Sequence, residues 1–402
     1  MRRRRLLALL TAGLLLLGGC DLSGLLPGSS NSSQRVDFGK YRQAYENNWQ
    51  YRHLDTVTQL NYGAIYTVLT DTVETDSLVT VGGEEHIGVR VSLPHPLKNR
   101  EEAATLYNAF FRDNPAFFYV GSTYGLEGYM REDTAYYDTL VLMYTMDAAQ
   151  REQAFAAIRQ VLKEIESGIP DSGNDSFETE VYLHDQLTRR CRYDEEAAEG
   201  GHETYPHAFT AYGALVEGKA VCEGYARGMQ LLLNTNGIRS TLVIGRSRQN
   251  GEEHMWNLVT VNGQNYHLDA TWNDGENQGQ HTFFNLTTAQ IQRTHDINPN
   301  QPGADTCTAT TDNYFVRNGA YFDTYDRDII ARYIAGALTR NSTVIELAFA
   351  PDKYDNAVLF LKNHTLAAEM VDAHTPEGGE SLWEYRLLGD SDQCVLTLLR
   401  KE

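Results

Sequence analysis

The sequence predicts an α+β protein, and three observations lead to this fold class. An apolar pattern with helical spacing follows Cys222, and two strand-like runs, 254–261 and 264–272, flank a tight-turn signal. The segments before and after this region each mix helical and strand patterns. Strands that follow one another through a short turn pair in antiparallel fashion, so we expect helices packed on antiparallel sheets.

Cys222 stands where the helical pattern begins, and Gly237 marks its end. The apolar face of this helix is predicted to consist of Tyr225, Met229, Leu232 and Leu233. A cysteine at a helix N-terminus lies at the positive end of the helix dipole and beside unsatisfied backbone N–H groups, and both favour the thiolate. An efficient nucleophile also needs a base and a group that orients the base.

The following hairpin offers both groups. Its turn is Asn262-Gly263, the strongest short signal for a two-residue type I′ turn, which pairs Val261 with Gln264. This register places His254 and Asp269 on one face, diagonally across adjacent strands and within side-chain reach at about 7–8 Å. The opposite face is apolar and is predicted to pack into the core; it comprises Met255, Val259, Val261, Tyr266, Leu268, Ala270 and Trp272.

Three blocks of sequence, Val221–Ala226, His254–Asn257 and Tyr266–Trp272, resemble the catalytic blocks of the bacterial transglutaminase-like superfamily, a branch of the papain-like folds. The resemblance covers about residues 175–300 and includes the upstream segment 212–222 and Phe283-Phe284-Asn285. It implies a papain-like core in which the helix bearing the cysteine packs on an antiparallel sheet bearing the histidine and the aspartate. It also implies that Cys222 is the nucleophile, His254 the general base and Asp269 its orienting residue. Met255 departs from the small residue that is usual in the family.

Other roles for these residues were weighed. A zinc site would recruit Cys222, His254, His267 and Asp269, but their spacing matches no zinc signature and a zinc-bound thiolate would be a poor nucleophile. We therefore expect no metal and no cofactor, with His267 beside the site. The backbone N–H of Cys222 is the expected first oxyanion donor; the further candidates for the oxyanion hole or the cleft are Tyr205, His207 and Trp256.

The N-terminus reads as a processing signal. Arg2–Arg5 are followed by the apolar run Leu6–Leu17 and by Leu17-Gly18-Gly19-Cys20, which resembles a bacterial lipobox with Cys20 as the lipidated residue. Twelve apolar-dominated residues are too few to span a bilayer, which takes about 20. The predicted location is therefore extracytoplasmic, with a lipid anchor in the bacterial cell membrane. The formal net charge of −20, without a basic stripe, argues against nucleic acid as a partner.

The chain divides into five predicted parts: a signal peptide (1–20), a Ser/Gly/Asn-rich tether (21–35), an N-terminal α+β module (36–172), the transglutaminase-like domain (173–304) and a small C-terminal α+β module (305–402). Aromatic residues of the first module could line a ligand groove, but their spacing favours a core. Among the cysteines, Cys307 and Cys394 are the pair expected to form a disulfide.

The expected chemistry is acyl transfer through a thioester on Cys222, with peptides or proteins of the cell envelope as substrates. Hydrolysis, as in a cysteine protease or amidase, is favoured over cross-linking because water is abundant. The main alternative is a catalytically silent transglutaminase-like scaffold lipoprotein. A sugar-binding envelope protein that uses the Tyr-rich first module is a third possibility. The oligomeric state and the roles of the flanking modules are not indicated by the sequence.

Overall fold

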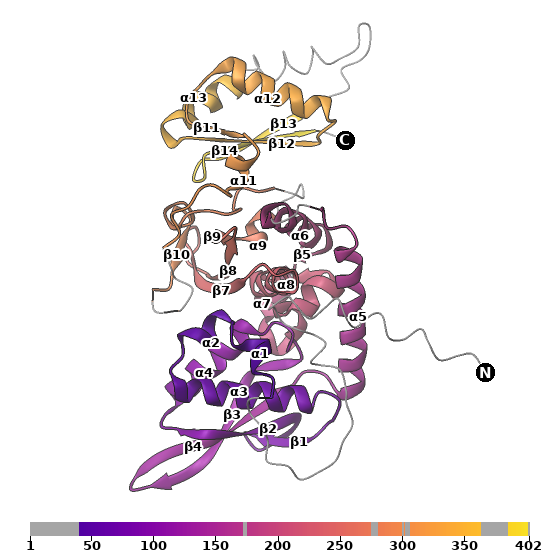
Figure 1. Cartoon of the computed structure of the whole chain (residues 1–402), viewed down its shortest axis with the longest axis vertical. Coiled ribbons are helices and arrows are strands. Elements are labelled where there is room, and N and C mark those ends of the chain that lie inside the picture. The colour runs from indigo at the N-terminus through magenta and orange to yellow at the C-terminus, as the bar shows by residue number, and fades with distance from the viewer. Residues whose placement is uncertain are drawn as a thin grey trace, which may run out of the picture. The chain divides into compact units, whose positions relative to one another are not determined.

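The computed structural model describes residues 40–171, 175–274, 280–299, 301, 306–362 and 385–400 (Figure 1). The predicted signal peptide, Cys20 and the tether lie outside these residues. The chain forms two compact units, Met1–Asp171 with Asp194–Leu242, and Ser172–Tyr193 with Val243–Glu402. In the described part of the chain, no helix is both long and apolar enough to cross a membrane.

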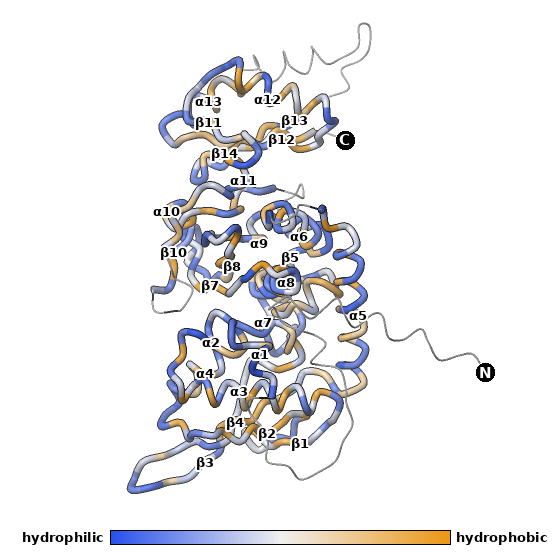
Figure 2. The backbone as a smooth tube through the Cα atoms, viewed as in Figure 1, coloured by the Kyte–Doolittle hydropathy of each residue, from blue (hydrophilic) through white to orange (hydrophobic). Residues whose placement is uncertain are grey.

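The first unit begins with helices and a four-stranded sheet. Its sheet has the order β1–β2–β4–β3, and α3 packs against β2 (Figure 1). These elements are α1 (Arg42–Tyr45), α2 (Trp49–His53), α3 (Thr56–Asp71), β1 (Leu78–Val81), β2 (Glu84–Leu97), α4 (Arg100–Asp113), β3 (Val120–Arg131), β4 (Thr134–Tyr144) and α5 (Ala148–Glu166). The far end of the β3–β4 hairpin is hydrophilic (Figure 2).

Local signals explain where two of these helices begin. Asn99 caps α4 by accepting a hydrogen bond from the Glu102 N–H, and Asp147 with Gln150 forms a capping box at the start of α5. Many aromatic residues of this region lie in the core, as their spacing predicts, whereas Tyr129 on β3 is exposed. Phe117, Phe118 and Tyr119 are all at most 4% exposed.

The same unit continues after Asp194 with the segment that carries the cysteine. It comprises α7 (Glu195–Thr204), a 3₁₀ turn (Pro206–Phe209), a π-helical turn (Gly213–Glu217), β6 (Lys219–Ala220) and α8 (Cys222–Thr235). The predicted apolar face of α8 is buried, since Tyr225, Met229, Leu232 and Leu233 have no exposed surface. The helix ends at Thr235, and Gly237, two residues later, takes the left-handed conformation with a φ of 75°.

The second unit holds the predicted hairpin in a four-stranded sheet of order β10–β7–β8–β9. Its elements up to residue 297 are α6 (Ser176–Arg190), β5 (Arg192–Tyr193), β7 (Ser240–Ser247), β8 (Glu253–Val261), β9 (Gln264–Leu268), α9 (Ala270–Asn273), α10 (Thr288–Ile291) and β10 (His295–Ile297). The predicted register is confirmed, because Val261 pairs with Gln264 and Asn257 with Leu268. Asn262 and Gly263 both have positive φ values, 48° and 81°, as a type I′ turn requires.

The end of this hairpin differs from the expectation. We predicted strand structure to Trp272, but β9 ends at Leu268 and residues 270–273 form the short helix α9. Asp269 causes the change, since its side chain accepts hydrogen bonds from the N–H groups of Thr271 and Trp272 and so caps the helix. The two faces of the hairpin also differ less than predicted, because Trp256 and Leu258 are as buried as Val259.

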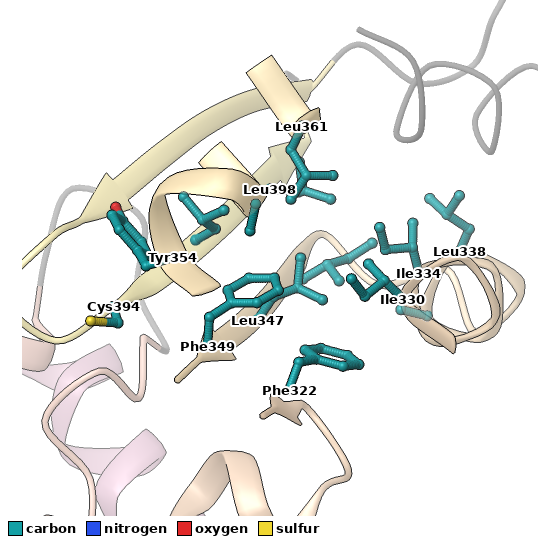
Figure 3. Close-up of a cluster of buried hydrophobic side chains, with 14 residues drawn as sticks. Phe322, Ile330, Ile334, Leu338, Leu347, Phe349, Tyr354, Leu361, Cys394 and Leu398 are labelled. Atoms are coloured by element: carbon teal, nitrogen blue, oxygen red, sulfur yellow. The ribbon is translucent and has the colours of Figure 1, made fainter. Parts of the chain in front are cut away.

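The C-terminal part of the second unit is an α+β layer. Its sheet has the order β11–β12–β14–β13, and its elements are α11 (Tyr314–Arg317), β11 (Tyr321–Phe322), α12 (Arg327–Thr339), β12 (Val344–Phe349), α13 (Pro351–Lys362), β13 (Tyr385–Asp390) and β14 (Val395–Arg400). Both long helices lie on the same side of this sheet (Figure 1). Leu347 and Leu398 of the sheet pack with Ile334 of α12 and Leu361 of α13 in one apolar cluster (Figure 3).

The predicted disulfide is wrong, because neither Cys307 nor Cys394 is in a disulfide. Each is buried in its own surroundings. Cys394 belongs to the apolar cluster of the C-terminal layer, whereas the backbone of Cys307 is bonded to Thr288 at the start of α10. The α+β class itself is confirmed, with helices and mainly antiparallel sheets in both units; in the C-terminal sheet, β11 pairs with β12 in parallel.

Candidate active site

Cys222 is the first residue of α8 and is partly exposed. Val221 precedes it in an extended conformation and provides no side-chain cap, so no capping side chain accepts a hydrogen bond from the N–H groups of the first helical turn. Gly224 allows the segment 205–210 to pack on the first turn of the helix, since a Cβ at this position would lie 2.3 Å from the carbonyl oxygen of Ala208. The Val221 N–H donates to that same oxygen at 3.0 Å. The surroundings of the cysteine are thus fixed by backbone contacts.

A charged pair that the sequence analysis missed lies beside Cys222. Glu223 accepts hydrogen bonds from Arg227 one turn later, at 2.9 Å from Nε and 2.8 Å from Nη2, and its other oxygen lies 3.4 Å from His202 Nε2. Burial alone would raise the pKa of Glu223, but Arg227 and His202 outweigh it and hold this pKa below its ordinary value. The spacing of four residues between Glu223 and Arg227, which makes them neighbours on one helix face, was the sequence signal that could have indicated this pair.

Two predicted candidates, Tyr205 and His207, lie in the segment that packs on the start of α8. Tyr205 packs against the small apolar cluster of Ala197, Ala208 and Val221. The Nδ1 atom of His207 lies 2.7 Å from Glu217 Oε1, so one nitrogen of this ring is already bound to a carboxylate. An oxyanion role for either residue stays a prediction.

His254 and Asp269 meet as the hairpin register predicts. The Nε2 atom of His254 lies 2.7 Å from Asp269 Oδ2, and the side chains are 7% and 0% exposed. The pair is positioned by strands β8 and β9 and by the start of helix α9. His254 lies on β8, and Asp269 follows β9, where its Oδ1 atom accepts the N–H groups of Thr271 at 3.0 Å and Trp272 at 3.2 Å.

The charge of Asp269 is stabilised by its neighbours. Its complete burial would raise the pKa of the carboxyl, but His254 and then His295 outweigh the burial and hold this pKa well below its ordinary value. An ionised carboxylate only accepts hydrogen bonds, so His254 Nε2 carries a proton. The other ring nitrogen, Nδ1, is then the basic atom of the neutral imidazole.

His295 is a site residue that the sequence analysis missed. Its Nε2 atom lies 3.2 Å from the same Oδ2 atom of Asp269, and both side chains are completely buried. His295 belongs to β10, which pairs with β7 and lies 26 residues after Asp269. No motif or periodicity in the sequence marked this residue, because only the sheet order brings it to Asp269.

Aromatic rings surround the His254–Asp269 pair. Trp256 is 1% exposed, its ring stacks near His254 at a centroid distance of 5.9 Å, and its indole N–H donates to His267 Nδ1 at 3.1 Å. Trp256 therefore supports the imidazole from the protein interior, and its N–H is already engaged. Trp272 was expected in the core, but it is partly exposed and its ring centroid lies 5.6 Å from that of His254.

His267 lies beside the site, behind Trp256. It is completely buried, and burial, followed by the nearby His295, lowers its pKa to about 3. Its second nitrogen, Nε2, lies 3.1 Å from Thr288 Oγ1. Both ring nitrogens of this neutral histidine are thus engaged, and it does not fit the zinc ligand set that was weighed from the sequence.

Among the residues with described positions, two clusters have the side-chain types of a metal site. They are His254, Asp269, His295 and His184, Asp185, His281. In the first cluster both Nε2 atoms face one ionised carboxylate oxygen, so both carry protons, which a metal ion would have to displace. This cluster is therefore a satisfied hydrogen-bond network.

In the second cluster, the amide of Asn273 determines which ring nitrogen of His184 carries the proton. Asn273 Oδ1 accepts from the Phe283 N–H at 2.8 Å, so its NH₂ group donates to His184 Nε2 at 3.1 Å. His184 Nδ1 then carries the proton and donates to Asp185 at 3.2 Å. A protonated nitrogen in this position favours an ion-pair network over a metal site.

Residues 163–270 match the model of the transglutaminase-like superfamily, a range that includes Cys222, His254 and Asp269. One similar solved structure is described as a TGase; it is 12% identical, covers 48% of this chain and 52% of its own, and has a TM-score of 0.28. Another is a candidate cysteine protease from Cytophaga hutchinsonii; it is 12% identical, covers 37% of this chain and 62% of its own, and has a TM-score of 0.24.

Each alignment thus spans less than two thirds of the solved chain. No curated protein matches the sequence. The matched range includes the first two sequence blocks, Val221–Ala226 and His254–Asn257, and the third block as far as Ala270. The chain therefore contains a domain of the transglutaminase-like superfamily, within residues 163–270.

Proposed function

We propose that this chain is an acyl-transfer enzyme in which Cys222 is the nucleophile, His254 the general base and Asp269 the residue that orients His254. The observation that carries the proposal is the buried 2.7 Å hydrogen bond between His254 Nε2 and Asp269 Oδ2, within a family domain that also contains Cys222. This bond supports Nδ1 as the atom that would exchange a proton with the nucleophile. A buried base oriented by a carboxylate is the arrangement that activates a weak nucleophile.

The proposed reaction has two halves. His254 Nδ1 takes the proton of the Cys222 thiol, and the sulfur attacks the carbonyl carbon of an amide, whose C=O electron pair moves to oxygen. The tetrahedral intermediate collapses to a thioester as the C–N bond breaks, and His254 returns the proton to the leaving amine. Water, activated by His254, then attacks the thioester, so that a carboxylic acid and the free thiol are released.

The oxyanion of the intermediate needs hydrogen-bond donors. The backbone N–H of Cys222, at the first position of α8, is the proposed first donor, because N–H groups of the first helical turn have no partner within the helix. Tyr205 and His207 are the candidates for a second donor, from the segment that packs on this helix start.

The proposed setting is the outer face of a bacterial cell membrane, with Cys20 carrying the lipid. Peptides or proteins of the cell envelope are then the substrates within reach, which makes the enzyme a cysteine protease or amidase. We favour hydrolysis over cross-linking because transfer to an amine requires that water be excluded from the thioester.

The test is the rate at which iodoacetamide alkylates Cys222 at pH 6.5 and at pH 9. A thiol with the ordinary pKa of about 8.5 is only about 1% ionised at pH 6.5, so an activated Cys222 should react up to about 100-fold faster there. His254→Ala should abolish this advantage at pH 6.5 and change the rate at pH 9 little. Modification is measured at Cys222 itself by peptide mass spectrometry, because the chain has five cysteines.

Two control variants define the result. Cys222→Ala gives the blank, and His86→Ala removes a partly exposed histidine of β2 that has no proposed role. Slow labelling at pH 6.5 in wild type, equal to that of His254→Ala, would reject the enzyme and favour a catalytically silent scaffold.

A further inference from the structure

The carboxylate of Asp269 serves two imidazoles and not one. Its Oδ2 atom lies 2.7 Å from His254 Nε2 and 3.2 Å from His295 Nε2, while Oδ1 is occupied by the two N–H groups at the start of α9. All four donors are fixed by the fold, and the carboxylate is completely buried. The proposed mechanism uses the bond to His254 and leaves the bond to His295 without a role.

The protons of His295 follow from its partners. Asp269 accepts only, so Nε2 of His295 carries a proton. The atom facing Nδ1 is Thr294 Oγ1 at 2.8 Å, and the same hydroxyl also lies 3.3 Å from the carbonyl oxygen of Ile291, to which it can donate. Asp269 thus requires the proton on Nε2 of His295, and Thr294 holds the opposite ring nitrogen.

The ring of His295 is held rigidly. It has no exposed surface, and its centroid lies 4.3 Å from that of Trp272 and 4.9 Å from that of Trp256. Both tryptophans also contact His254, so one set of rings packs against both imidazoles. A donor locked by packing holds its acceptor in one orientation, which a mobile donor or a water molecule does not.

The network continues into the C-terminal layer. The amide of Gln393, in the turn between β13 and β14, donates to Thr294 Oγ1 at 3.3 Å and to the carbonyl oxygen of Gln290 at 3.2 Å. This turn therefore supports the hydroxyl that contacts Nδ1 of His295. The C-terminal layer has no motif of its own, and this contact gives it a link to Asp269.

We propose that His295 is a positioning residue for the proposed acyl-transfer reaction: its N–H holds the Asp269 carboxylate in the orientation that aligns His254, and the contact of Thr294 with Nδ1 holds the ring of His295 in place. The inference rests on the proposed function, since it assigns His295 a part in the same site. His295 does not touch the substrate in this scheme. It acts through Asp269.

The test uses the same alkylation of Cys222, with His295→Phe and His295→Gln. Phenylalanine keeps a ring between the tryptophans but has no N–H, whereas the glutamine amide can place a donor near the position of Nε2. His295→Phe should lower the rate at pH 6.5 by roughly 10-fold or more, because a misplaced catalytic group loses up to about 100-fold. His295→Gln should recover most of the rate.

The ratio of the rates at pH 6.5 and pH 9 separates positioning from a structural effect. At pH 9 the thiol ionises without help, so a change that only opens or loosens the protein alters both rates together. A loss of positioning lowers the alkylation rate at pH 6.5 more than the rate at pH 9 and so changes the ratio of the two rates. Thr294→Val is a second variant, outside direct contact with Asp269, and should lower the ratio less than His295→Phe does; it keeps the test decisive if His295→Phe does not fold.

Each outcome decides a different claim. If His254→Ala abolishes the labelling at pH 6.5 but folded His295→Phe and Thr294→Val keep the wild-type ratio, the positioning role is wrong and the proposed function stands. If His254→Ala itself has no effect, the proposed function fails and the role of His295 fails with it.

Discussion

At the scale of single residues, Asp269 combines three tasks in one side chain. It ends strand β9 by capping α9, it binds His254, and it binds His295. Two oxygen atoms suffice because Oδ1 takes the backbone donors and Oδ2 takes the imidazoles. The consequence is a buried carboxylate that remains ionised across the neutral pH range, held so by the imidazoles against the effect of burial.

Replacing Asp269 by asparagine should remove the activation of Cys222. The amide is neutral, so it cannot stabilise the imidazolium that forms when His254 takes a proton. We expect the alkylation rate at pH 6.5 to fall between about 10-fold and 100-fold, towards that of an ordinary thiol, with little change at pH 9. The measurement is the same labelling assay, after thermal denaturation has established that Asp269→Asn folds. Wild-type labelling at pH 6.5 in the folded variant would contradict this role.

At the scale of secondary-structure elements, a buried ion-pair network joins α6, the segment after α9 and β12. His281 lies between two carboxylates, with Nε2 3.1 Å from Asp185 and Nδ1 2.8 Å from Glu346, and its ring stacks on Tyr314 at 3.7 Å. Burial lowers the pKa of His281, but Glu346 and Asp185 outweigh it and raise this pKa to about 9. His281 is therefore a buried cation at neutral pH, and it connects the transglutaminase-like region to the C-terminal sheet.

This network should make the stability of the protein fall as the pH rises above neutrality. A group whose pKa is higher in the folded state stabilises the fold fully below its unfolded pKa, near 6.5, and loses that contribution as the pH rises through about 9. The shift corresponds to roughly 3 kcal/mol. Chemical denaturation of wild type and His281→Gln at several pH values should show a stability difference that shrinks from pH 6.5 to pH 9.5.

Other groups also titrate between pH 6.5 and pH 9.5, but their contributions to stability cancel when wild type is compared with His281→Gln. The pKa of the buried Asp113 is raised to about 7, mainly by burial, but this carboxyl is present in both proteins. His184 faces the same Asp185 and is neutral, since burial lowers its pKa. A stability difference that stays constant from pH 6.5 to pH 9.5 would show that His281 is not the titrating group.

At the scale of the whole molecule, the chain joins a strongly acidic body to a basic, apolar N-terminus. The formal net charge is −20, and the four arginines of the predicted signal peptide oppose it. So acidic a body is repelled by anionic lipid surfaces, which leaves a covalent lipid as the proposed means of attachment.

Cys20→Ala should therefore release the protein from the membrane fraction. Thiol lipidation of Cys20 is the proposed anchor, and a chain without it has no described helix able to replace it. Fractionation of cells that express wild type or Cys20→Ala, followed by immunoblotting, measures the distribution. Cys191→Ala is the matched control, since this buried cysteine lies within the folded body. Equal membrane association of Cys20→Ala and wild type would reject the anchor.

The sequence by itself determined the features that depend on neighbouring residues. The Asn262-Gly263 turn set the register of the hairpin, Asn99 and Asp147 marked helix starts, and the blocks around Cys222, His254 and Asp269 indicated the family. Such signals are readable because each partner lies within a few residues, so that backbone geometry alone decides the contact. The α+β class followed from the same local patterns.

Only the tertiary structure decided which distant side chains share a partner. It brought His295 to Asp269 and His281 between Asp185 and Glu346, and it kept Cys307 and Cys394 apart from disulfide bonding. The end of β9 was also decided there, because Asp269 is held by contacts from β8 and β10 as well as by its own helix cap. These contacts depend on sheet order and side-chain packing over long stretches of chain, which no short window of sequence records.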